Sequence, residues 1–129
     1  MKTLVIHPTD PSTDFLKPIY ANIPDVTVLR SGIKKDVDEQ IKQHDRIIMM
    51  GHGSPWGLFS VGKFSTPTGY VIDKFTVPLL KEKENIFIWC NADRFVNKHK
   101  LRGFFSGMFI SEVDEARMCG LPNTTYPQV

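Results

Sequence analysis

A histidine and a cysteine each follow a short apolar segment of the kind that forms a buried strand. His52 follows residues 46–50 and lies between two glycines, and Cys90 ends the apolar run 86–90. If both segments are parallel strands of one sheet, their carboxyl ends lie at the same edge and bring the two side chains together. A histidine beside a cysteine can hold it as the thiolate, which is the form that attacks a carbonyl carbon. These two residues are therefore our candidates for nucleophilic catalysis.

The residues next to this pair offer backbone and side-chain groups to a substrate. The backbone at Gly53 is flexible, so its N–H can approach a developing oxyanion, and we assign it that role. Ser54, Asn91 and Asp93 follow the same two segments, so we expect them at the same edge and assign them to substrate binding. From its position, the Asp93 carboxylate is expected to select a basic substrate residue.

Two stretches of the sequence resemble the caspase-like (clan CD) cysteine peptidases, a group that includes caspases, gingipains, clostripain and the CHAT domains. The matching residues are an apolar run that ends in His-Gly at 47–53 and an apolar run that ends in Cys at 86–90, with a hairpin-like stretch between them. The resemblance implies a dyad at the sheet edge, in which His52 is the general acid/base and Cys90 is the nucleophile. The sequence departs from the family at Trp89, because a small or amide residue is common at that position.

The resemblance and the residues together predict a peptidase-like hydrolase that cleaves a peptide or a related acyl bond. Its substrate would be a peptide or a small molecule. Thiol chemistry of this kind requires no cofactor, because the cysteine and the histidine supply the nucleophile and the proton carrier.

The segments that would position the pair alternate between strand and helix. Near-continuous apolar runs such as 2–7 suit strands that are buried on both faces of a parallel sheet. Apolar residues recur every four positions from Ile33 to Ile41, which is the pattern of a helix with one face on a sheet. The expected strands are 2–7, 26–29, 46–50, 70–72, 86–90 and 103–110, and the expected helices are 14–20, 34–44, 76–83, 92–99 and 111–119, with a hairpin or flap within 54–69.

This alternation is typical of a single α/β domain, which we expect to span residues 1–129. A length of 129 residues fits one such domain. We predict a three-layer sandwich of a caspase-like or Rossmann-like kind, in which helices cover both faces of a mostly parallel sheet of about five strands. The functional site is expected beyond the carboxyl ends of the strands.

The composition excludes several classes of partner and location. With 16 basic and 14 acidic residues the net charge is +2, which is too small to indicate binding to nucleic acid or to an anionic membrane. The longest apolar runs are far shorter than a membrane span, and the run 4–6 is too short for a secretory leader. The two cysteines do not make a disulfide framework, so we expect a reducing, cytoplasmic location. The sequence does not indicate an oligomeric state.

A second class of function fits the same edge of the sheet. The segment 51–54 could receive a phosphate in a nest of backbone N–H groups, although it has neither the P-loop nor the dinucleotide-binding spacing. A Rossmann-like module that binds a nucleotide or small metabolite there would not need a thiolate. A non-catalytic interaction domain on a peptidase-like scaffold is a third alternative, because fold does not determine function. The ligand-binding residues of the second alternative would be Ser12, Thr13, Ser54 and Asn91.

The same polar residues also have purely structural interpretations. Cys90 could be a packing thiol at a strand end, His52 a turn histidine, and His7 a structural histidine after the first strand. We expect no metal site and no cofactor, because the histidines and cysteines show no zinc-binding spacing. The residues considered for zinc are His7, His52, Cys90 and His99.

Overall fold

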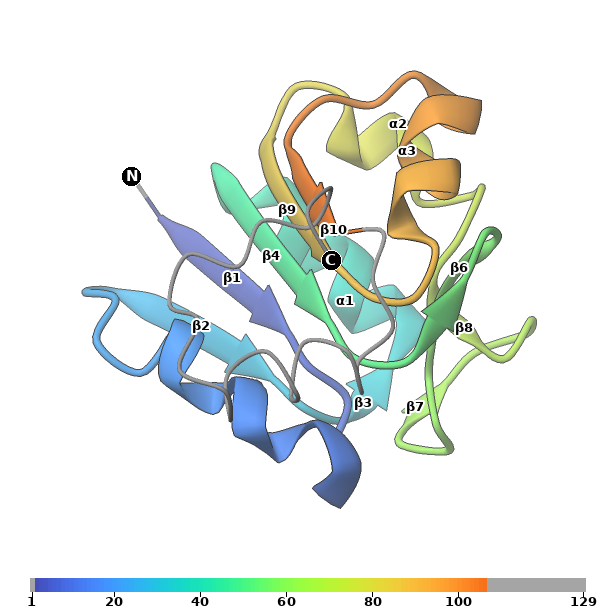
Figure 1. The fold of residues 1–129 in the computed structure, drawn as a ribbon. Helices are drawn as coiled ribbons and strands as arrows, with labels where there is room; N and C mark the ends of the chain where they lie inside the picture. Colours follow the sequence, from blue (N-terminus) through green and yellow to red (C-terminus); the bar gives the residue numbers. More distant parts are fainter. Residues whose placement is uncertain (1, 107–129) are drawn as a thin grey trace, which may run out of the picture.

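Five parallel strands form the central sheet of the computed structural model, which describes residues 2–106 (Figure 1). The strands lie in the order β10-β9-β4-β1-β2, and every neighbouring pair is parallel. The expectation of an α/β fold with a mostly parallel sheet is therefore confirmed. The strands are β1 (Thr3–Ile6), β2 (Val26–Leu29), β4 (Arg46–Met50), β9 (Glu84–Ile88) and β10 (Phe104–Ser106).

The strands at the centre of the sheet are apolar along most of their length because both of their faces are covered. Successive side chains of a strand point to opposite faces, so Ile47 and Met49 of β4 lie in one core cluster. Ile48 and Met50 lie in the other cluster. All four of these side chains are at most 1% exposed. This packing on both faces explains the continuous apolar run that the sequence shows at this strand.

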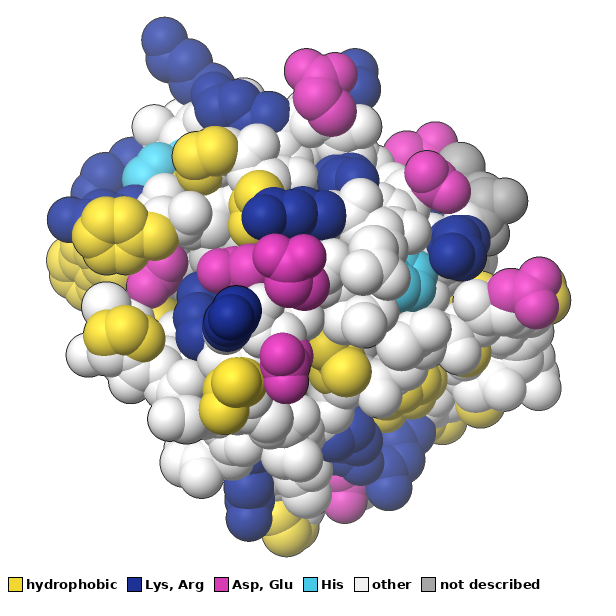
Figure 2. All heavy atoms as spheres, turned by 180° about the vertical axis from the view of Figure 1, so that it is seen from behind, with side chains coloured by type: hydrophobic (Ala, Val, Ile, Leu, Met, Phe, Trp, Pro, Cys, Tyr) yellow, Lys and Arg dark blue, Asp and Glu magenta, His cyan; other side chains and the backbone are white. Residues whose placement is uncertain are grey.

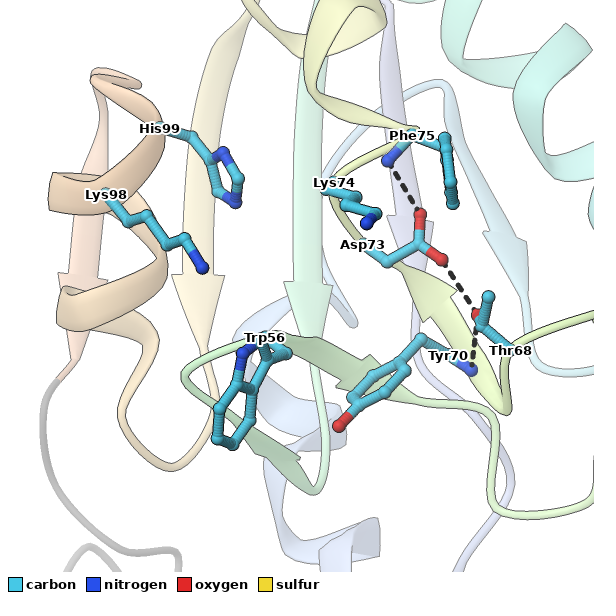
Figure 3. Close-up of a pocket in the computed structure, with 8 residues that line it drawn as sticks. All are labelled: Trp56, Thr68, Tyr70, Asp73, Lys74, Phe75, Lys98 and His99. Atoms are coloured by element: carbon cyan, nitrogen blue, oxygen red, sulfur yellow. Dashed lines mark hydrogen bonds between the residues drawn. The ribbon is translucent and has the colours of Figure 1, made fainter.

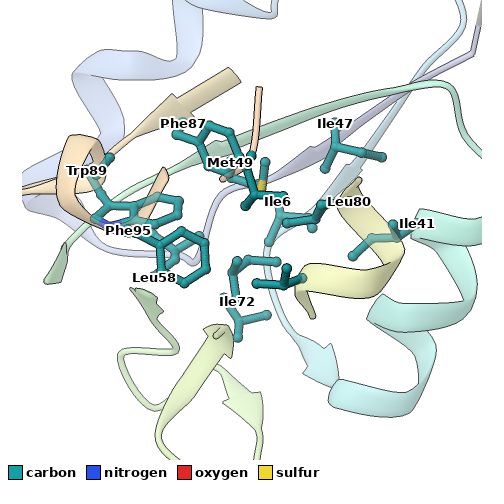
Figure 4. Close-up of a cluster of buried hydrophobic side chains, with 14 of the residues drawn as sticks. Ile6, Ile41, Ile47, Met49, Leu58, Ile72, Leu80, Phe87, Trp89 and Phe95 are labelled. Carbon is teal, nitrogen blue, oxygen red and sulfur yellow. The ribbon is translucent and has the colours of Figure 1, made fainter. Parts of the chain in front are cut away.

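Three α-helices of the described chain cover one face of the sheet through buried apolar side chains (Figure 4). Ile41, Leu80 and Phe95 come from the three helices in turn. They share a core cluster with Met49 and Phe87 of the sheet. The four-residue repeat around Ile41 is thus the signature of a helix that packs on the sheet. The helices are α1 (Lys34–Lys42), α2 (Val77–Leu80) and α3 (Ala92–His99).

The opposite face is covered by the 3-10 helix η1 (Pro11–Ile19), which lies against β1 and β2 in Figure 1. Leu16 of η1 is buried, and so is Tyr20, the residue that follows the helix. Both side chains share a cluster with Val5 and Ile48 of the sheet.

A smaller antiparallel sheet continues from the carboxyl end of β4. Its strands lie in the order β5-β6-β8, and Leu58 and Ile72 anchor it to the core on the face that the α-helices cover. A separate parallel pair joins β3 to β7. The hairpin expected after β4 is therefore present. These strands are β3 (Gly32–Ile33), β5 (Gly53–Ser54), β6 (Gly57–Phe59), β7 (Phe64–Ser65) and β8 (Tyr70–Ile72).

The first helix begins earlier than the sequence predicts. Its expected start is residue 14, but Asp10 caps it and Pro11 is its first residue. The Asp10 carboxylate accepts a hydrogen bond from the N–H of Ser12 at 3.0 Å. Pro11 is tolerated in the first turn because a residue there has no helical partner for its N–H.

Other element boundaries shift by a few residues. β9 ends at Ile88, so Cys90 lies in the turn after the strand and not within it. The helices α1 and α2 are shorter than predicted, whereas α3 has the predicted bounds. Within residues 2–106, no helix is long and apolar enough to cross a membrane. Two predictions lie outside the described residues: the end of the strand at 103–110 and the helix at 111–119.

A buried hydrogen-bond network joins the end of β1 to η1. The His7 side chain is buried, with Nδ1 2.8 Å from the Tyr20 hydroxyl oxygen and Nε2 3.1 Å from Oγ1 of Thr13. Arg30 donates to the His7 carbonyl oxygen at 3.0 Å and pairs with Asp14 at 2.7 Å. Burial, followed by the charge of Arg30, lowers the pKa of His7 from 6.5 to about 4. His7 therefore fastens η1 to the sheet as a neutral ring at pH 7.

The stability of the protein should fall between pH 6.5 and about pH 4 because of His7. The unfolded chain binds a proton at His7 below about pH 6.5, whereas the buried ring stays neutral down to about pH 4. The contribution of the neutral ring is therefore complete above this window and lost as pH falls through it, which amounts to about 3 kcal/mol. Urea denaturation of wild type and His7→Gln across this window measures the effect, because the variant lacks this part of the slope.

Parallel stability profiles for wild type and His7→Gln would contradict this assignment. The ring resonances of His7 in the wild-type protein give a second test that needs no variant. They should stay at their neutral position through most of the same window.

Candidate active site

The order of the strands reverses between β1 and β4. β2 lies on one side of β1, and β4, β9 and β10 follow on the other side. Ligands of open parallel sheets bind beyond the carboxyl ends of the strands at such a switch point. The loop after β1 contains Asp10 and Ser12, and the loop after β4 contains His52. β4 and β9 stay joined to their ends, since the N–H of Gly51 donates to the Ile88 carbonyl oxygen at 3.1 Å.

His52 is held at the switch point by the two polar residues of the first loop. Its Nε2 lies 2.6 Å from Oγ of Ser12 and 3.2 Å from Oδ2 of Asp10. The Ser12 hydroxyl also donates to Oδ1 of Asp10 at 2.9 Å, so the three side chains form a closed set of contacts. The His52 side chain is 39% exposed and that of Asp10 is 25% exposed, so both reach solvent.

This arrangement decides which ring nitrogen of His52 carries the proton. Hydrogen bonds from the backbone N–H and the hydroxyl of Ser12 lower the pKa of Asp10, and the charge of His52 adds to the effect. The carboxylate is thus ionised at neutral pH and only accepts hydrogen bonds, while the Ser12 hydroxyl already donates to it. Nε2 therefore carries the hydrogen of the neutral ring, and Nδ1 carries the lone pair that can accept a proton.

The cluster of Asp10, Ser12 and His52 is not a serine-hydrolase relay. In such a relay the serine and the carboxylate bind opposite nitrogens of the imidazole. Here both lie against Nε2. The cluster can orient the ring and balance its charge, and it leaves proton transfer to Nδ1.

Cys90 is half-buried in the turn between β9 and α3. Asn91, next to it, has a left-handed backbone with a φ of 64°, and the chain enters α3 at Ala92. The Asn91 side chain folds back, so that its Nδ2 donates a hydrogen bond to Sγ of Cys90 at 3.3 Å. A donor at this position favours a thiolate, because a hydrogen bond to the charged form stabilises it.

The Trp89 indole ties the His52 loop to the Cys90 turn. The Trp89 side chain is buried, and its Nε1 donates to the backbone oxygen of Ser54 at 2.9 Å. The ring packs directly on Gly53, where a Cβ would lie only 2.2 Å from Cδ1 of the indole. Because Trp89 precedes Cys90 and Gly53 follows His52, these contacts hold the two candidate catalytic residues on loops that pack against each other.

The Gly53 N–H points away from the neighbouring strand of the hairpin. The N–H of Phe59 donates to the His52 carbonyl oxygen at 2.8 Å, so these two residues form a hydrogen-bonded pair of the β5–β6 ladder. Gly53 lies opposite Leu58 in the adjacent pair, where the N–H and C=O groups point outward. β5 is an edge strand among the described strands of this sheet. An oxyanion donor requires an outward-pointing N–H of this kind.

The remaining predicted site residues lie in different surroundings. Asp93 is half-buried in the first turn of α3, beside the Cys90 turn. The Ser54 hydroxyl is engaged inside the hairpin, where it accepts from the N–H of Trp56 at 3.1 Å and lies 3.1 Å from the hydroxyl oxygen of Tyr70. Ser54 therefore fixes the shape of the hairpin.

The partners of His52 are the part of the site that the sequence analysis missed. Ser12 is expected at this edge of the sheet as a ligand-binding residue, but the contact of Asp10 and Ser12 with His52 is not predicted. The signal for it is the Asp-x-Ser spacing directly after the first strand. An aspartate that caps a helix at this place lies at the switch point.

The residues considered for zinc are not gathered in the described part of the chain. Among residues 2–106, no group of three or more His, Cys, Asp or Glu side chains is placed to hold a metal ion. Both ring nitrogens of His7 are bonded within the core. His99 packs against Phe95, with 4.7 Å between the ring centroids.

Comparisons of the chain with protein-family models, with curated proteins and with solved structures give no match. The likeness to caspase-like peptidases thus stays a prediction from the sequence. The function has to be inferred from the geometry of the site.

Replacing Gly53 by alanine should destabilise the protein by about 2 kcal/mol. The new Cβ would lie 2.2 Å from Cδ1 of Trp89 and 2.6 Å from the carbonyl oxygen of Gly57, so the indole or the hairpin must shift. Urea denaturation measures the change. In a Trp89→Leu background the same replacement should cost less, because the indole that it meets is absent.

Gly62→Ala is the matched control for this replacement. A Cβ at Gly62 meets no atom within 4 Å, so the backbone strain at a φ of 74° remains as the cost, about 1 kcal/mol. Equal losses at Gly53 and Gly62, with no relief in the Trp89→Leu background, would show that the indole does not set the position of the His52 loop.

Proposed function

We propose that this chain is a cysteine-dependent hydrolase that cleaves a peptide or a related acyl bond on a three-layered, caspase-like scaffold. The observation that carries the proposal is the fixed position of His52. Asp10 and Ser12 orient its ring, and Trp89 packs its loop against the turn that contains Cys90. Thiol catalysis needs a histidine within reach of a cysteine, and loops that pack against each other can bring the two side chains together.

The first half of the proposed reaction forms a bond to the sulfur. Nδ1 of His52 removes the proton of the Cys90 thiol, and the thiolate attacks the carbonyl carbon of the substrate. Asp10 stabilises the resulting imidazolium, because its carboxylate lies 3.2 Å from Nε2. The Asn91 amide, 3.3 Å from the sulfur, stabilises the thiolate before the attack. The oxyanion of the tetrahedral intermediate accepts a hydrogen bond from the N–H of Gly53.

The second half of the reaction releases both products. The intermediate collapses, the bond to the leaving group breaks, and the leaving group takes the proton from Nδ1 of His52. A thioester then remains on Cys90. His52 removes a proton from water, the oxygen attacks the thioester, and the acid product leaves as the thiol is restored. Asp93, at the start of α3, binds a basic residue of the substrate.

The nucleotide-binding alternative has less support at this edge. Thr13 is buried and bonded within the core, and the Ser54 hydroxyl is engaged within the hairpin. The Asp10 carboxylate accepts a hydrogen bond from Ser12 and would repel a phosphate placed there. The same carboxylate lies beside the His52 ring, where the hydrolase mechanism uses it.

The alkylation rate of Cys90 by iodoacetamide, measured against pH, tests the catalytic pair. The chain has two cysteines, so Cys119 is replaced by alanine to leave one signal. We expect rapid alkylation well below the pKa of an ordinary thiol, about 8.5, because His52 takes the proton. In His52→Ala the profile should return to that of an ordinary thiol. A slow or ordinary thiol in both proteins would overturn the proposal and favour a non-catalytic domain.

Replacing Cys90 or His52 by alanine should lower hydrolysis by about 1,000-fold or more, because the nucleophile or its base is lost. Fluorogenic peptide amides that differ in the residue before the cleaved bond measure turnover. Cys119→Ala is the control and should keep full activity. Hydrolysis that persists in Cys90→Ala would exclude thiol catalysis.

Replacing Asp10 by asparagine should lower kcat and change KM little, because Asp10 acts on His52 and not on the substrate. The same peptide amides measure this effect.

Replacing Asp93 by asparagine should reduce the preference for Lys or Arg peptides over neutral ones. The same peptide amides measure this preference. An unchanged preference in Asp93→Asn would remove Asp93 from substrate recognition.

A further inference from the structure

A pocket of about 210 Å³ lies between the hairpin sheet, the turn before α2 and the end of α3 (Figure 3). Trp56 and Tyr70 lie along one end of this space, and Lys98 reaches toward it from α3. Lys74 and Phe75 lie across from Lys98. None of the proposed catalytic residues lines the pocket.

Aromatic rings with exposed faces line the pocket. Trp56 is 61% exposed and Phe75 is 68% exposed, which are large fractions for apolar rings of this size. Tyr70 is half-buried, stacks on Phe59 with 5.0 Å between the ring centroids, and is fixed through its hydroxyl at Ser54. Exposed apolar surface that gathers at a pocket is typical of a binding site. The rings offer flat surfaces on which another ring can stack.

Two ammonium groups border the same space. Lys74 and Lys98 are both exposed, and Nζ of Lys74 lies 5.2 Å from the centre of the Phe75 ring. The carboxylate of Asp73, in the wall, is turned to internal donors. It accepts hydrogen bonds from Oγ1 of Thr68 at 2.8 Å and from the N–H of Phe75 at 3.0 Å. Two lysines against one carboxylate leave the lining of the pocket with more positive than negative charge.

Positive charge at the end of α3 comes from the lysine side chains near it. Lys98 lies in the last turn of the helix beside His99, whose ring also lines the pocket. Burial, followed by the charges of Lys98 and Lys81, lowers the pKa of His99. Figure 2 shows exposed hydrophobic side chains beside Lys or Arg side chains and a histidine at its left. This side of the molecule lies at the right of Figure 1, where α3 and the hairpin are, because the two views differ by a half turn. An anion is attracted to such a surface.

We propose that this pocket binds a small ligand in which a flat aromatic ring carries a phosphate group. The ring stacks among Trp56, Tyr70 and Phe75, and Lys74 and Lys98 bind the phosphate. A space of about 210 Å³ holds a ring and its substituent, so a larger ligand would extend into solvent. Nucleotides and simple aryl phosphates share this chemistry. The proposal does not depend on Cys90 or on hydrolysis.

Isothermal titration of the full chain with four probes tests the proposal. AMP and phenyl phosphate carry both a ring and a phosphate, adenosine carries the ring alone, and inorganic phosphate carries no ring. We expect saturable binding of AMP, of phenyl phosphate or of both. Adenosine and inorganic phosphate should bind at least about tenfold more weakly or not at all. Binding of phenyl phosphate without AMP identifies a single-ring ligand, and the reverse identifies a nucleotide.

Variants of the lining residues locate the binding. Lys74→Ala/Lys98→Ala should weaken binding about tenfold or more, and Trp56→Ala should do the same. Lys35→Ala/Lys42→Ala is the matched control, because it removes the same charge from α1, which does not line the pocket. The fluorescence of Trp56 should change on binding, whereas the buried Trp89 should respond little.

Three results would overturn the proposal. One is the absence of saturable binding for both ring phosphates. Another is binding that the lining variants and the control weaken equally, because the site would then lie elsewhere. The third is inorganic phosphate or adenosine binding as tightly as the ring phosphates, because the pocket would then not recognise the two groups together.

Discussion

The contact between the Trp89 indole and the backbone of the hairpin determines where the candidate catalytic residues lie relative to each other. The indole belongs to the core, since it also meets Phe87 and Phe95 with ring centroids 5.6 Å and 5.4 Å apart. The position of the His52 loop is therefore set by the packing of the domain interior and not by the loop alone. Close packing of this kind transmits any change of shape, because interiors contain few voids that could absorb it. Trp89 is the residue at which the sequence departs from the caspase-like peptidases that it resembles. It is thus also the residue that joins the His52 loop to the Cys90 turn.

A second constraint links folding to the site through Asp10. The same carboxylate begins η1 through Ser12 and faces Nε2 of His52. Hydrogen bonds from Ser12 at the start of the helix stabilise its negative charge, and the same charge faces the imidazole. The orientation of His52 therefore requires η1 to be formed. The buried His7 network holds η1 on the sheet through Tyr20 and Thr13, so it also helps to keep Asp10 in position beside His52.

Much of the fold follows from local sequence patterns, and the site follows only in part. The strands at 26–29 and 46–50 and the helix at 92–99 were predictable, because apolar runs and an amphipathic repeat are local signals.

The contact of His52 with Ser12 joins residues 40 positions apart. It depends on β1 and β4 being neighbours in the sheet, which no local pattern contains. The sequence predicts Cys90 within a strand, because Trp89 extends the apolar run. The indole instead packs under the hairpin, so tertiary packing ends the strand earlier. The sequence does not determine the start of η1, because several polar residues there can cap a helix.

The left-handed turn after Cys90 also limits how this chain can change over evolutionary time. Asn91 meets two separate demands, a backbone φ of 64° and an amide donor to the sulfur. Glycine would satisfy the backbone but donates nothing from a side chain. Aspartate tolerates the same backbone, yet it would place a negative charge against a thiolate. Most other residues would strain the turn. Few single substitutions at Asn91 can therefore meet both demands. A descendant with glycine or aspartate at this position would keep the fold but lose the hydrogen bond from the amide to the sulfur of Cys90.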